Sequence, residues 1–248
     1  KSSKKKVKKL ETNQELIIKT KADWVNKALV NKSDYEKKYK KSLKNNDEFW
    51  KKEGKRITWI KPYKKIKNVK YSKDEVHIKW YEDGTLNASA NCIDRHLKNK
   101  KNKIAIIWVG DDPKDTKKIS YKQLHKEVSK TANALKELGI KKGDRVTIYL
   151  TMIPELAITM LACARIGAIH SIIFGGFSSD SIAGRIDDCK SDYVITADEG
   201  IRGGKTIPLK NIVDEALTKC RNIKKCIVVK RTGNSINWMI DRDVWYHD

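Results

Sequence analysis

Apolar and polar positions follow two different rhythms over residues 104–248. Five short runs rich in β-branched residues predict buried strands: IAIIWV, RVTIYL, AIHSIIF, DYVITA and KCIVVK. Between them lie segments whose apolar residues return every three or four positions, as on one face of a helix: SYKQLHKEVSKTANALKELG, PELAITMLACARI, SDSIAGRIDDC and PLKNIVDEAL. This alternation predicts an α/β fold, with a mostly parallel sheet flanked by helices on both faces.

Residues at the ends of the amphipathic segments support their assignment as helices. Ser120 stands at an N-cap position, and Gln123 has the spacing of a capping box. Pro154 occupies a first-turn position, where its missing N–H is tolerated. Gly139 and Gly167 follow the last apolar positions and are placed to end two of the helices.

Residues 20–60 carry a weaker helical pattern. Their aromatic side chains are spaced among charges, and Ser33 with Glu36 three positions later predicts a helix start. Because these helices contain few apolar residues, they need a larger body to pack against. The following segment EVHIKWYEDG alternates apolar and polar residues and predicts a strand that ends at a turn.

The formal net charge of +23 is concentrated near the amino terminus. Residues 1–70 contain 24 Lys and Arg but 8 Asp and Glu. Such a surplus is typical of proteins that bind nucleic acid or an anionic membrane surface. Nearly all of these charges are Lys, however, whereas surfaces that clamp phosphates or contact bases rely on Arg. We therefore favour a solvated surface with a mobile basic tail at residues 1–20, and we expect no nucleic-acid partner.

Several classes of protein are excluded by what the sequence lacks. Five cysteines, an odd number with no close pair, argue against a disulfide framework. No stretch approaches the roughly 20 apolar residues of a membrane span. No apolar segment follows the Lys-rich start, as it does in a secretory signal. We therefore expect a cytoplasmic protein, with the nucleus as a second compartment, and no membrane partner.

Two Gly-containing segments follow predicted strands, at the sheet edge where ligands bind in such folds. In the first, Gly175 and Gly176 follow Phe174, and paired glycines let a ligand come close to the backbone. Ser178 or Ser179 is placed to cap the next helix, whose amino terminus favours anions. The same residues also fit an ordinary turn between a strand and a helix, so residue types alone leave both interpretations open.

The second segment is Arg202-Gly203-Gly204-Lys205. Arg offers a planar fork of donors and Lys a point charge, so two cations around a flexible backbone are suited to clamp a phosphate. The alternative is an exposed polar loop. Residue chemistry does not decide between the two interpretations.

No complete catalytic constellation is visible in the sequence. His170 lies inside a predicted strand, which favours a packing role, and Cys92 with His96 lack companions at metal-ligand spacing. Asp187 and Asp188 end a helix without further carboxylates nearby in the sequence. The nucleophile motif of the α/β-hydrolases and the zinc-protease motif are absent. We therefore expect no catalytic residue and no metal site within this chain.

Five segments, in order along the chain, resemble the amino-terminal part of the AMP-forming acetyl-coenzyme A synthetases: ADWVNKAL, DGTLNASANCIDRHL, ISYKQLHKEVSKTANALKELGIKKGDRV, MIPELAITMLACARIGAIHSIIFGGFSSDSIAGRIDD and ADEGIRGGKTIPLK. The similarity runs from Lys21 to Asp248. These ligases belong to the acyl-adenylate-forming superfamily, with a large amino-terminal and a small mobile carboxyl-terminal domain. The resemblance implies a family-specific extension at residues 21–103 and the first α/β portion of an incomplete AMP-binding domain at 104–248.

The resemblance also implies an activity and a binding site. Acetate would attack ATP with the help of Mg²⁺, giving acetyl-adenylate and pyrophosphate, and the thiol of CoA would then displace AMP to give acetyl-CoA. The family's segment beside the CoA 3′-phosphate falls on Arg202, Gly203, Gly204 and Lys205. Its loop beside the pantetheine tunnel falls on Phe174, Gly175 and Gly176.

Other parts of the family pattern would lie beyond Asp248. These are the phosphate loop, the acetate pocket, the adenine and ribose contacts and the lysine of the adenylation step. The sequence begins with Lys1 rather than Met, and we expect a piece of a longer enzyme that is inactive alone. Three alternatives stay open: a ligase for propionate or acetoacetate, a basic protein that binds nucleic acid or a surface, and a shortened non-catalytic relative.

Overall fold

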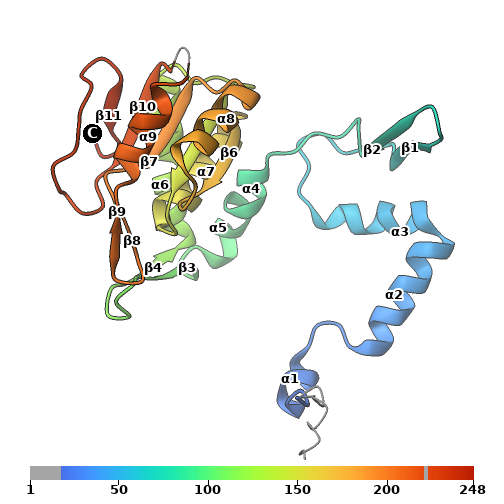
Figure 1. The fold of residues 1–248 in the computed structure, drawn as a ribbon. Coiled ribbons are helices and arrows are strands. Elements are labelled where there is room, and N and C mark those ends of the chain that lie inside the picture. The colour runs from blue at the N-terminus through green and yellow to red at the C-terminus, as the bar shows by residue number, and fades with distance from the viewer. Residues whose placement is uncertain (1–17, 221–222) are drawn as a thin grey trace, which may run out of the picture. The chain divides into compact units, whose positions relative to one another are not determined.

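A computed structural model describes residues 18–220 and 223–248 (Figure 1). The basic tail predicted at residues 1–20 lies almost entirely outside this range. The chain divides into two compact units, one ending at Arg56 and the other beginning at Ile57.

The first unit is helical, as the sequence predicts. Its helices are α1 (Ala22–Lys27), α2 (Lys32–Lys44) and α3 (Asn46–Glu53), followed by a single 3₁₀ turn at Gly54–Arg56. None of the residues of the three α-helices is buried. The prediction that Ser33 caps α2 is wrong. The cap is Asn31, whose side-chain oxygen accepts the N–H of Asp34 at 2.9 Å, because Asn serves as well as Ser at this position.

The second unit opens with an antiparallel hairpin and two short helices. They are β1 (Lys67–Tyr71), β2 (Val76–Trp80), α4 (Ala88–Cys92) and α5 (Asp94–Lys100). The strand predicted at EVHIKWYEDG is therefore confirmed as β2. The side chain of Asn87 donates to the carbonyls of Ala164 and Arg165, and Arg165 forms a bidentate pair with Asp94 at 2.7 and 2.8 Å. These bonds fasten the two short helices to the α/β body.

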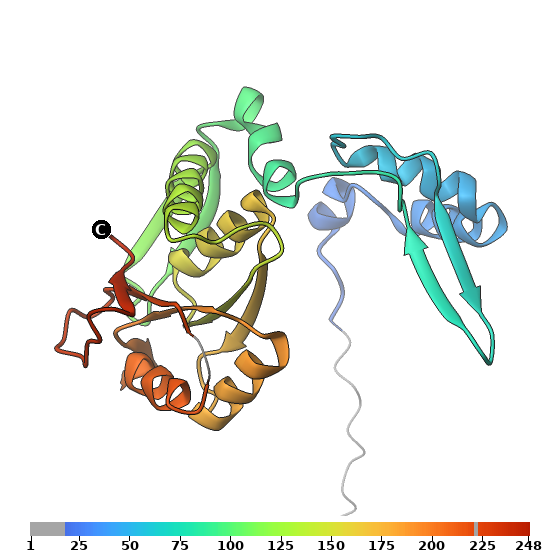
Figure 2. The same cartoon turned by 90° about the horizontal axis from the view of Figure 1, so that it is seen from above.

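The body is a five-stranded parallel sheet with helices on both faces, which confirms the predicted α/β fold. The strands are β5 (Arg145–Leu150), β6 (Ile169–Phe174), β7 (Tyr193–Ala197), β10 (Lys225–Val229) and β11 (Asp243–Trp245), in the order β11-β10-β7-β5-β6. Figure 2 shows two helices above the sheet, α6 (Tyr121–Glu137) and α7 (Pro154–Ile166), and two below, α8 (Ser179–Cys189) and α9 (Leu209–Leu217).

The helix ends form as predicted. Ser120 and Gln123 make a complete capping box at the start of α6, and Pro154 occupies the first turn of α7. Gly167 ends α7 in the left-handed region, with φ of 79°, where a residue with a Cβ is disfavoured. Because these signals act within a few residues of the chain, they can be recognised without tertiary information.

Two predicted strands form but lie elsewhere than expected. The first, β3 (Ile104–Val109), does not join the parallel sheet and pairs antiparallel with β4 (Thr116–Ser120). The turn of six residues between them is too short for the crossover that parallel pairing requires. The strand AIHSIIF was expected to be buried, but β6 is an edge strand and only Ile173 is buried on it.

Five strands were not predicted from the sequence: β1 and β4, of five residues each, and the three-residue strands β8, β9 and β11. The strands β8 (Gly200–Arg202) and β9 (Lys205–Ile207) form a small antiparallel hairpin where the sequence predicted a loop. The strand β11 extends the parallel sheet beyond β10. Runs of three residues are too short to show a period of two, so pattern analysis does not detect them.

Polar contacts fasten the last segment of the chain to the body. The hydroxyls of Thr131, on α6, and Tyr246 lie 2.8 Å apart. Lys210 on α9 is fully buried, and its ammonium lies 2.7 Å from Asp214 and 2.9 Å from Asp243. Burial alone would raise the pKa of Asp243, but hydrogen bonds from groups that include Arg242 and Lys210 outweigh it and hold that pKa below its usual value.

Candidate functional site

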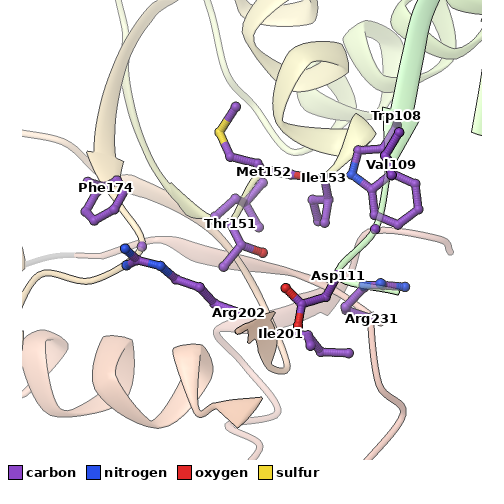
Figure 3. A pocket seen from close by; sticks show the side chains of 13 residues that line it. Trp108, Val109, Asp111, Thr151, Met152, Ile153, Phe174, Ile201, Arg202 and Arg231 are labelled. Carbon is purple, nitrogen blue, oxygen red and sulfur yellow. Dashed lines mark hydrogen bonds between the residues drawn. The ribbon is translucent and has the colours of Figure 1, made fainter. Parts of the chain in front are cut away.

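A cavity of about 290 Å³ opens at the carboxyl ends of β5 and β6, where ligands bind in parallel α/β sheets (Figure 3). Its walls come from five parts of the chain that are far apart in sequence. Its lining residues are Trp108, Val109, Gly110, Asp111, Leu150, Thr151, Met152, Ile153, Phe174, Gly175, Ile201, Arg202 and Arg231. Three of these belong to the two Gly-containing segments singled out from the sequence.

The structure brings those two segments into contact. The guanidinium carbon of Arg202 lies 5.2 Å from the centre of the Phe174 ring, within the range of a cation–π interaction (Figure 3). Gly176 lies beside both side chains. A Cβ built there would be 3.0 Å from the Phe174 ring and 3.5 Å from Nη1 of Arg202, so a larger residue would disturb the pair. Phe174, Gly176 and Arg202 therefore form one local arrangement.

The loop after β6 is held in place by contacts with β5. The hydroxyl of Tyr149, a fully buried residue of β5, donates to the carbonyl of Phe177 at 3.0 Å, and burial raises the pKa of this phenol. A Cβ on Gly175 would lie 3.3 Å from the carbonyl oxygen of Leu150, which explains the small residue. The N-cap of α8 is Ser178, one of the two serines considered for it.

The RGGK segment is the turn of the hairpin β8–β9. Arg202 and Lys205 pair across the hairpin, so their side chains flank the turn. Gly203 and Gly204 have φ of 59° and 70°, and consecutive positive φ values are the signature of a tight two-residue hairpin turn. No other group lies within 4 Å of a Cβ at either position, so backbone conformation rather than space requires glycine. A Gly-Gly pair is a known hairpin signal, and it could have revealed this turn from the sequence.

A carboxylate that the sequence did not single out binds this turn. The N–H of Gly203 donates to Oδ1 of Asp111 at 3.0 Å, and the N–H of Gly204 to Oδ2 at 2.5 Å. These hydrogen bonds, that of Gly204 first, lower the pKa of Asp111. Residues 92 positions apart in the chain make this contact, so no local sequence signal could have found it.

The two cations beside the turn are available to an anion. Arg202 and Lys205 are exposed to solvent. Within residues 18–220 and 223–248, neither has a carboxylate within the 4.0 Å of an ion pair. Across the cavity, by contrast, Arg231 is paired with Asp115 at 3.2 Å. An anionic ligand therefore meets unpaired positive charge at the hairpin.

The opposite wall of the cavity is fastened to the sheet. The indole N–H of Trp108 donates to the carbonyl of Met152, just beyond β5, at 2.6 Å. The guanidinium of Arg231 stacks over the same indole, with its carbon 5.2 Å from the ring centre. Neither Trp108 nor Arg231 was singled out from the sequence, because an aromatic residue in a strand and an Arg in a loop are ordinary features.

A second carboxylate organises the loop after β10. Asp198 follows β7 and is fully buried. It accepts backbone N–H groups from Arg231 at 2.8 Å, Thr232 at 3.1 Å, Gly233 at 2.7 Å and its neighbour Glu199 at 2.7 Å. These four bonds fix the loop from which the side chain of Arg231 reaches the cavity.

Some classes of site are absent from the part of the chain that the structure describes. No group of three or more His, Cys, Asp or Glu side chains there is arranged to hold a metal ion. No helix there is long and apolar enough to span a bilayer. His170 lies on the edge strand β6 and is partly buried.

Two family models match the chain. Residues 93–247 match the AMP-binding enzymes, and residues 35–92 match the amino terminus of acetyl-coenzyme A synthetase. The first match alone covers more than half of the chain. The chain therefore belongs to the family of AMP-binding enzymes. Within that family, the second match relates it to the acetyl-coenzyme A synthetases, in agreement with the resemblance of its motifs.

Curated relatives agree with the family models. The chain is 58% identical over 225 residues to acetyl-coenzyme A synthetase of Parvibaculum lavamentivorans, and 56% identical over 229 residues to that of Mesorhizobium japonicum. Each alignment covers 91% of this chain and 35% of the relative. The chain therefore spans about a third of the length of these relatives.

A solved structure has the same fold. Acetoacetyl-CoA synthetase from Streptomyces lividans superposes with a TM-score of 0.74 at 22% identity. The superposition covers 84% of this chain and 31% of that protein. At this identity the likeness shows that the fold is shared, and it agrees with the parallel sheet described above.

Proposed function

We propose that the protein containing these residues makes acetyl-CoA from acetate, ATP and CoA, through acetyl-adenylate and with release of AMP and pyrophosphate. The observation that carries the proposal is the identity of 56–58%, over about nine tenths of this chain, to proteins named acetyl-coenzyme A synthetase. ATP and CoA follow as substrates. Mg²⁺ is proposed as the ion that accompanies ATP.

Within this reaction, we propose that the cavity and the hairpin β8–β9 bind CoA. The unpaired side chains of Arg202 and Lys205 face the 3′-phosphate, and Phe174 with Gly175 and Gly176 borders the remainder of the molecule. The contact between Arg202 and Phe174 supports this assignment, because it joins a phosphate-binding group to a flat apolar surface. The segment contributes binding energy to the second half-reaction and no catalytic group.

The test removes both cations from the full-length enzyme. Arg202→Ala with Lys205→Ala should raise KM for CoA, because two charges facing the phosphate are lost. ATP–pyrophosphate exchange, which reports on adenylation without CoA, should hardly change. The matched control is Lys130→Ala with Lys136→Ala, which removes two exposed charges from α6 on one face of the sheet.

Dephospho-CoA, which lacks the 3′-phosphate, makes the assignment specific. The double variant should lose its preference for CoA over dephospho-CoA, whereas the control variant should keep it. If both substrates suffer equally in the double variant, the 3′-phosphate is not the partner of these cations. Increasing salt should weaken the preference of the unchanged enzyme, because the site faces solvent.

The acyl substrate is the finer part of the proposal. The names of the relatives favour acetate over propionate and acetoacetate. A comparison of kcat/KM for the three acids decides among them. We also propose that residues 1–248 alone are inactive, and the formation of acetyl-CoA by this purified piece would refute that.

Three earlier predictions remain proposals. We propose the domain boundaries at residues 20 and 103, a cytoplasmic location, and the absence of a nucleic-acid partner. No finding supports a nuclear location. Binding to DNA or RNA that falls steeply with salt, and disappears when residues 1–20 are deleted, would contradict the third proposal.

A further inference from the structure

The turn that carries the proposed phosphate-binding cations has little structure of its own. Each strand of the hairpin β8–β9 has three residues, and an isolated two-stranded hairpin is at best marginally stable in water. At its base, Gly200 packs against Thr151, where a Cβ would lie 2.5 Å from a methyl carbon. At its tip, the contacts that the structure describes for Gly203 and Gly204 are those to Asp111. The position of the tip therefore depends on that carboxylate.

Asp111 is itself held in place. It lies in the turn between β3 and β4, which is closed by a bond from the N–H of Gly110 to the carbonyl of Asp115 at 2.7 Å. The hairpin β3–β4 is fastened to the segment after β5 by the indole of Trp108 on β3, and to the loop after β10 by the pair Arg231–Asp115. Asp111 (Figure 3) is thus a fixed carboxylate, and among the described residues it is the one hydrogen-bond partner given for the N–H groups of Gly203 and Gly204.

The geometry excludes one way of binding a ligand at the turn. Two successive N–H groups with positive φ form a concave donor site of the kind that binds phosphates. Here both donors are already used by the two oxygens of Asp111. A phosphate must then be held by the side chains of Arg202 and Lys205, whose directions are set by the turn between them.

We infer that Asp111 is a positioning residue for the anion site, which it shapes by fixing the Gly203–Gly204 turn so that Arg202 and Lys205 face the ligand. This inference rests on the proposed binding of the CoA phosphate. In this inference, the role of Gly203 and Gly204 is to allow the conformation of the turn, and they do not contact the nucleotide. Asp111 contacts neither substrate nor reacting atoms in this account.

The test uses Asp111→Asn in the full-length protein. Asn keeps the size but loses the charge, and one of its two terminal atoms becomes a donor that cannot accept an N–H. The matched control is Asp112→Asn, which removes the same charge one position away. Asp112 accepts the N–H of Lys114 within its own turn and makes no described contact with the hairpin.

The first measurement is independent of any ligand. Hydrogen exchange of the Gly203 and Gly204 amides should become about tenfold faster in Asp111→Asn, as expected for the loss of a hydrogen bond to a charged acceptor. Exchange in Asp112→Asn should stay at the rate of the unchanged protein. Equal rates in all three proteins would overturn the inference.

The second measurement reports on positioning. In Asp111→Asn, KM for CoA should rise about fivefold, and KM for dephospho-CoA should change less than about twofold, because only the phosphate contacts are misplaced. A lower KM for CoA would show that Asp111 competes with the ligand for the turn, which contradicts the inference. An equal rise for both substrates would show a general structural role and would contradict it too.

The two measurements separate this inference from the proposed function. If the unchanged enzyme does not prefer CoA to dephospho-CoA, the assignment of the phosphate is wrong, and the inference fails as a statement about CoA. Exchange at Gly203 and Gly204 then still decides whether Asp111 holds the turn. If the preference exists but Asp111→Asn leaves it intact, the proposed function stands and the inference is wrong.

Discussion

Two aspartates at the carboxyl edge of the sheet perform the same chemistry in different surroundings. Asp198 is fully buried and accepts four backbone N–H groups, whereas Asp111 lies at the surface and accepts two. Each carboxylate accepts backbone N–H groups of a turn or loop beside the cavity, in place of the carbonyl acceptors that a helix or sheet would provide. The two sites differ in whether water can bond to the backbone N–H groups once the carboxylate is removed.

This difference separates structure from function. Buried N–H groups that lose their acceptor remain unpaired, so the cost falls on the stability of the whole fold. Exposed N–H groups turn to water, so the cost falls on local order. We therefore expect Asp198 to contribute to the stability of the whole fold, and Asp111 to the placement of the cations at the hairpin.

The largest expected effect is that of Asp198→Asn. The isosteric change leaves one acceptor for four donors and should lower the free energy of unfolding by about 3 kcal/mol. Urea unfolding of the chain measures this loss. Asp188→Asn on the exposed face of α8 is the matched control and should change the stability by less than about 0.5 kcal/mol. Equal effects in the two variants would remove the distinction between buried and exposed carboxylates.

Removal of an uncharged hydrogen-bond donor, the hydroxyl of Tyr149, should destabilise the fold less than the loss of Asp198 and more than the loss of Asp111. Tyr149→Phe removes the hydroxyl that holds the loop after β6 and should cost about 1 kcal/mol, a typical net value for one hydrogen bond. The measurement is again urea unfolding. Because the carbonyl of Phe177 belongs to a partly exposed residue, water can replace the lost donor. A loss as large as that of Asp198→Asn would mean that the loop is more deeply integrated than its exposure indicates.

The turn glycines should show a smaller, local effect. Gly203→Ala forces a Cβ into the left-handed region and should strain the hairpin by about 1 kcal/mol, whereas Gly203→Asn should be better tolerated. Little of this strain should reach the global unfolding transition, because the hairpin is exposed. Gly184→Ala, inside α8, is the control and should be stabilising. A stability gain in Gly203→Ala would contradict the assigned turn.

The smallest effect, and the most local, concerns pH. The bonds from Gly204 and Gly203 lower the pKa of Asp111, so the folded hairpin favours the ionised carboxylate. The contribution is complete above the ordinary Asp value of about 3.9 and is lost as the pH falls through the lower folded-state value. NMR shifts of the Gly203 and Gly204 amides should follow this titration. They should stay flat over the same range in Asp111→Asn.

The sequence predicted those parts of the fold that depend on local rules. Hydrophobic periods, the capping box at Ser120 and the glycine at the end of α7 each act within one helix or strand, so the four long helices and four of the five strands of the parallel sheet were predicted, as was the sheet type. Strand order was not predicted. The exposure of β6 and the separation of β3 from the sheet depend on which partners the chain brings together.

The candidate site was predicted in part for the same reason. The Phe174 and Arg202 segments stand out because they unite glycines with aromatic or cationic residues after strands. Their contact with each other was not foreseen, because it depends on the order of β6, β5 and β7 in the sheet. Asp111 carries no signal of its own, since its adjacent neighbour is also an aspartate and the residues that it binds lie 92 positions away.

That separation also has a consequence in time. At a synthesis rate of about 5–20 residues per second, the 92 residues between Asp111 and Gly203 take on the order of 5–20 s to make. The bonds Arg231–Asp115 and Thr131–Tyr246 span 116 and 115 residues, so both also close late. We therefore expect Trp108 and the aspartates of the hairpin β3–β4 to stay exposed during synthesis until their partners have been made. The cavity should be among the last features of this chain to form.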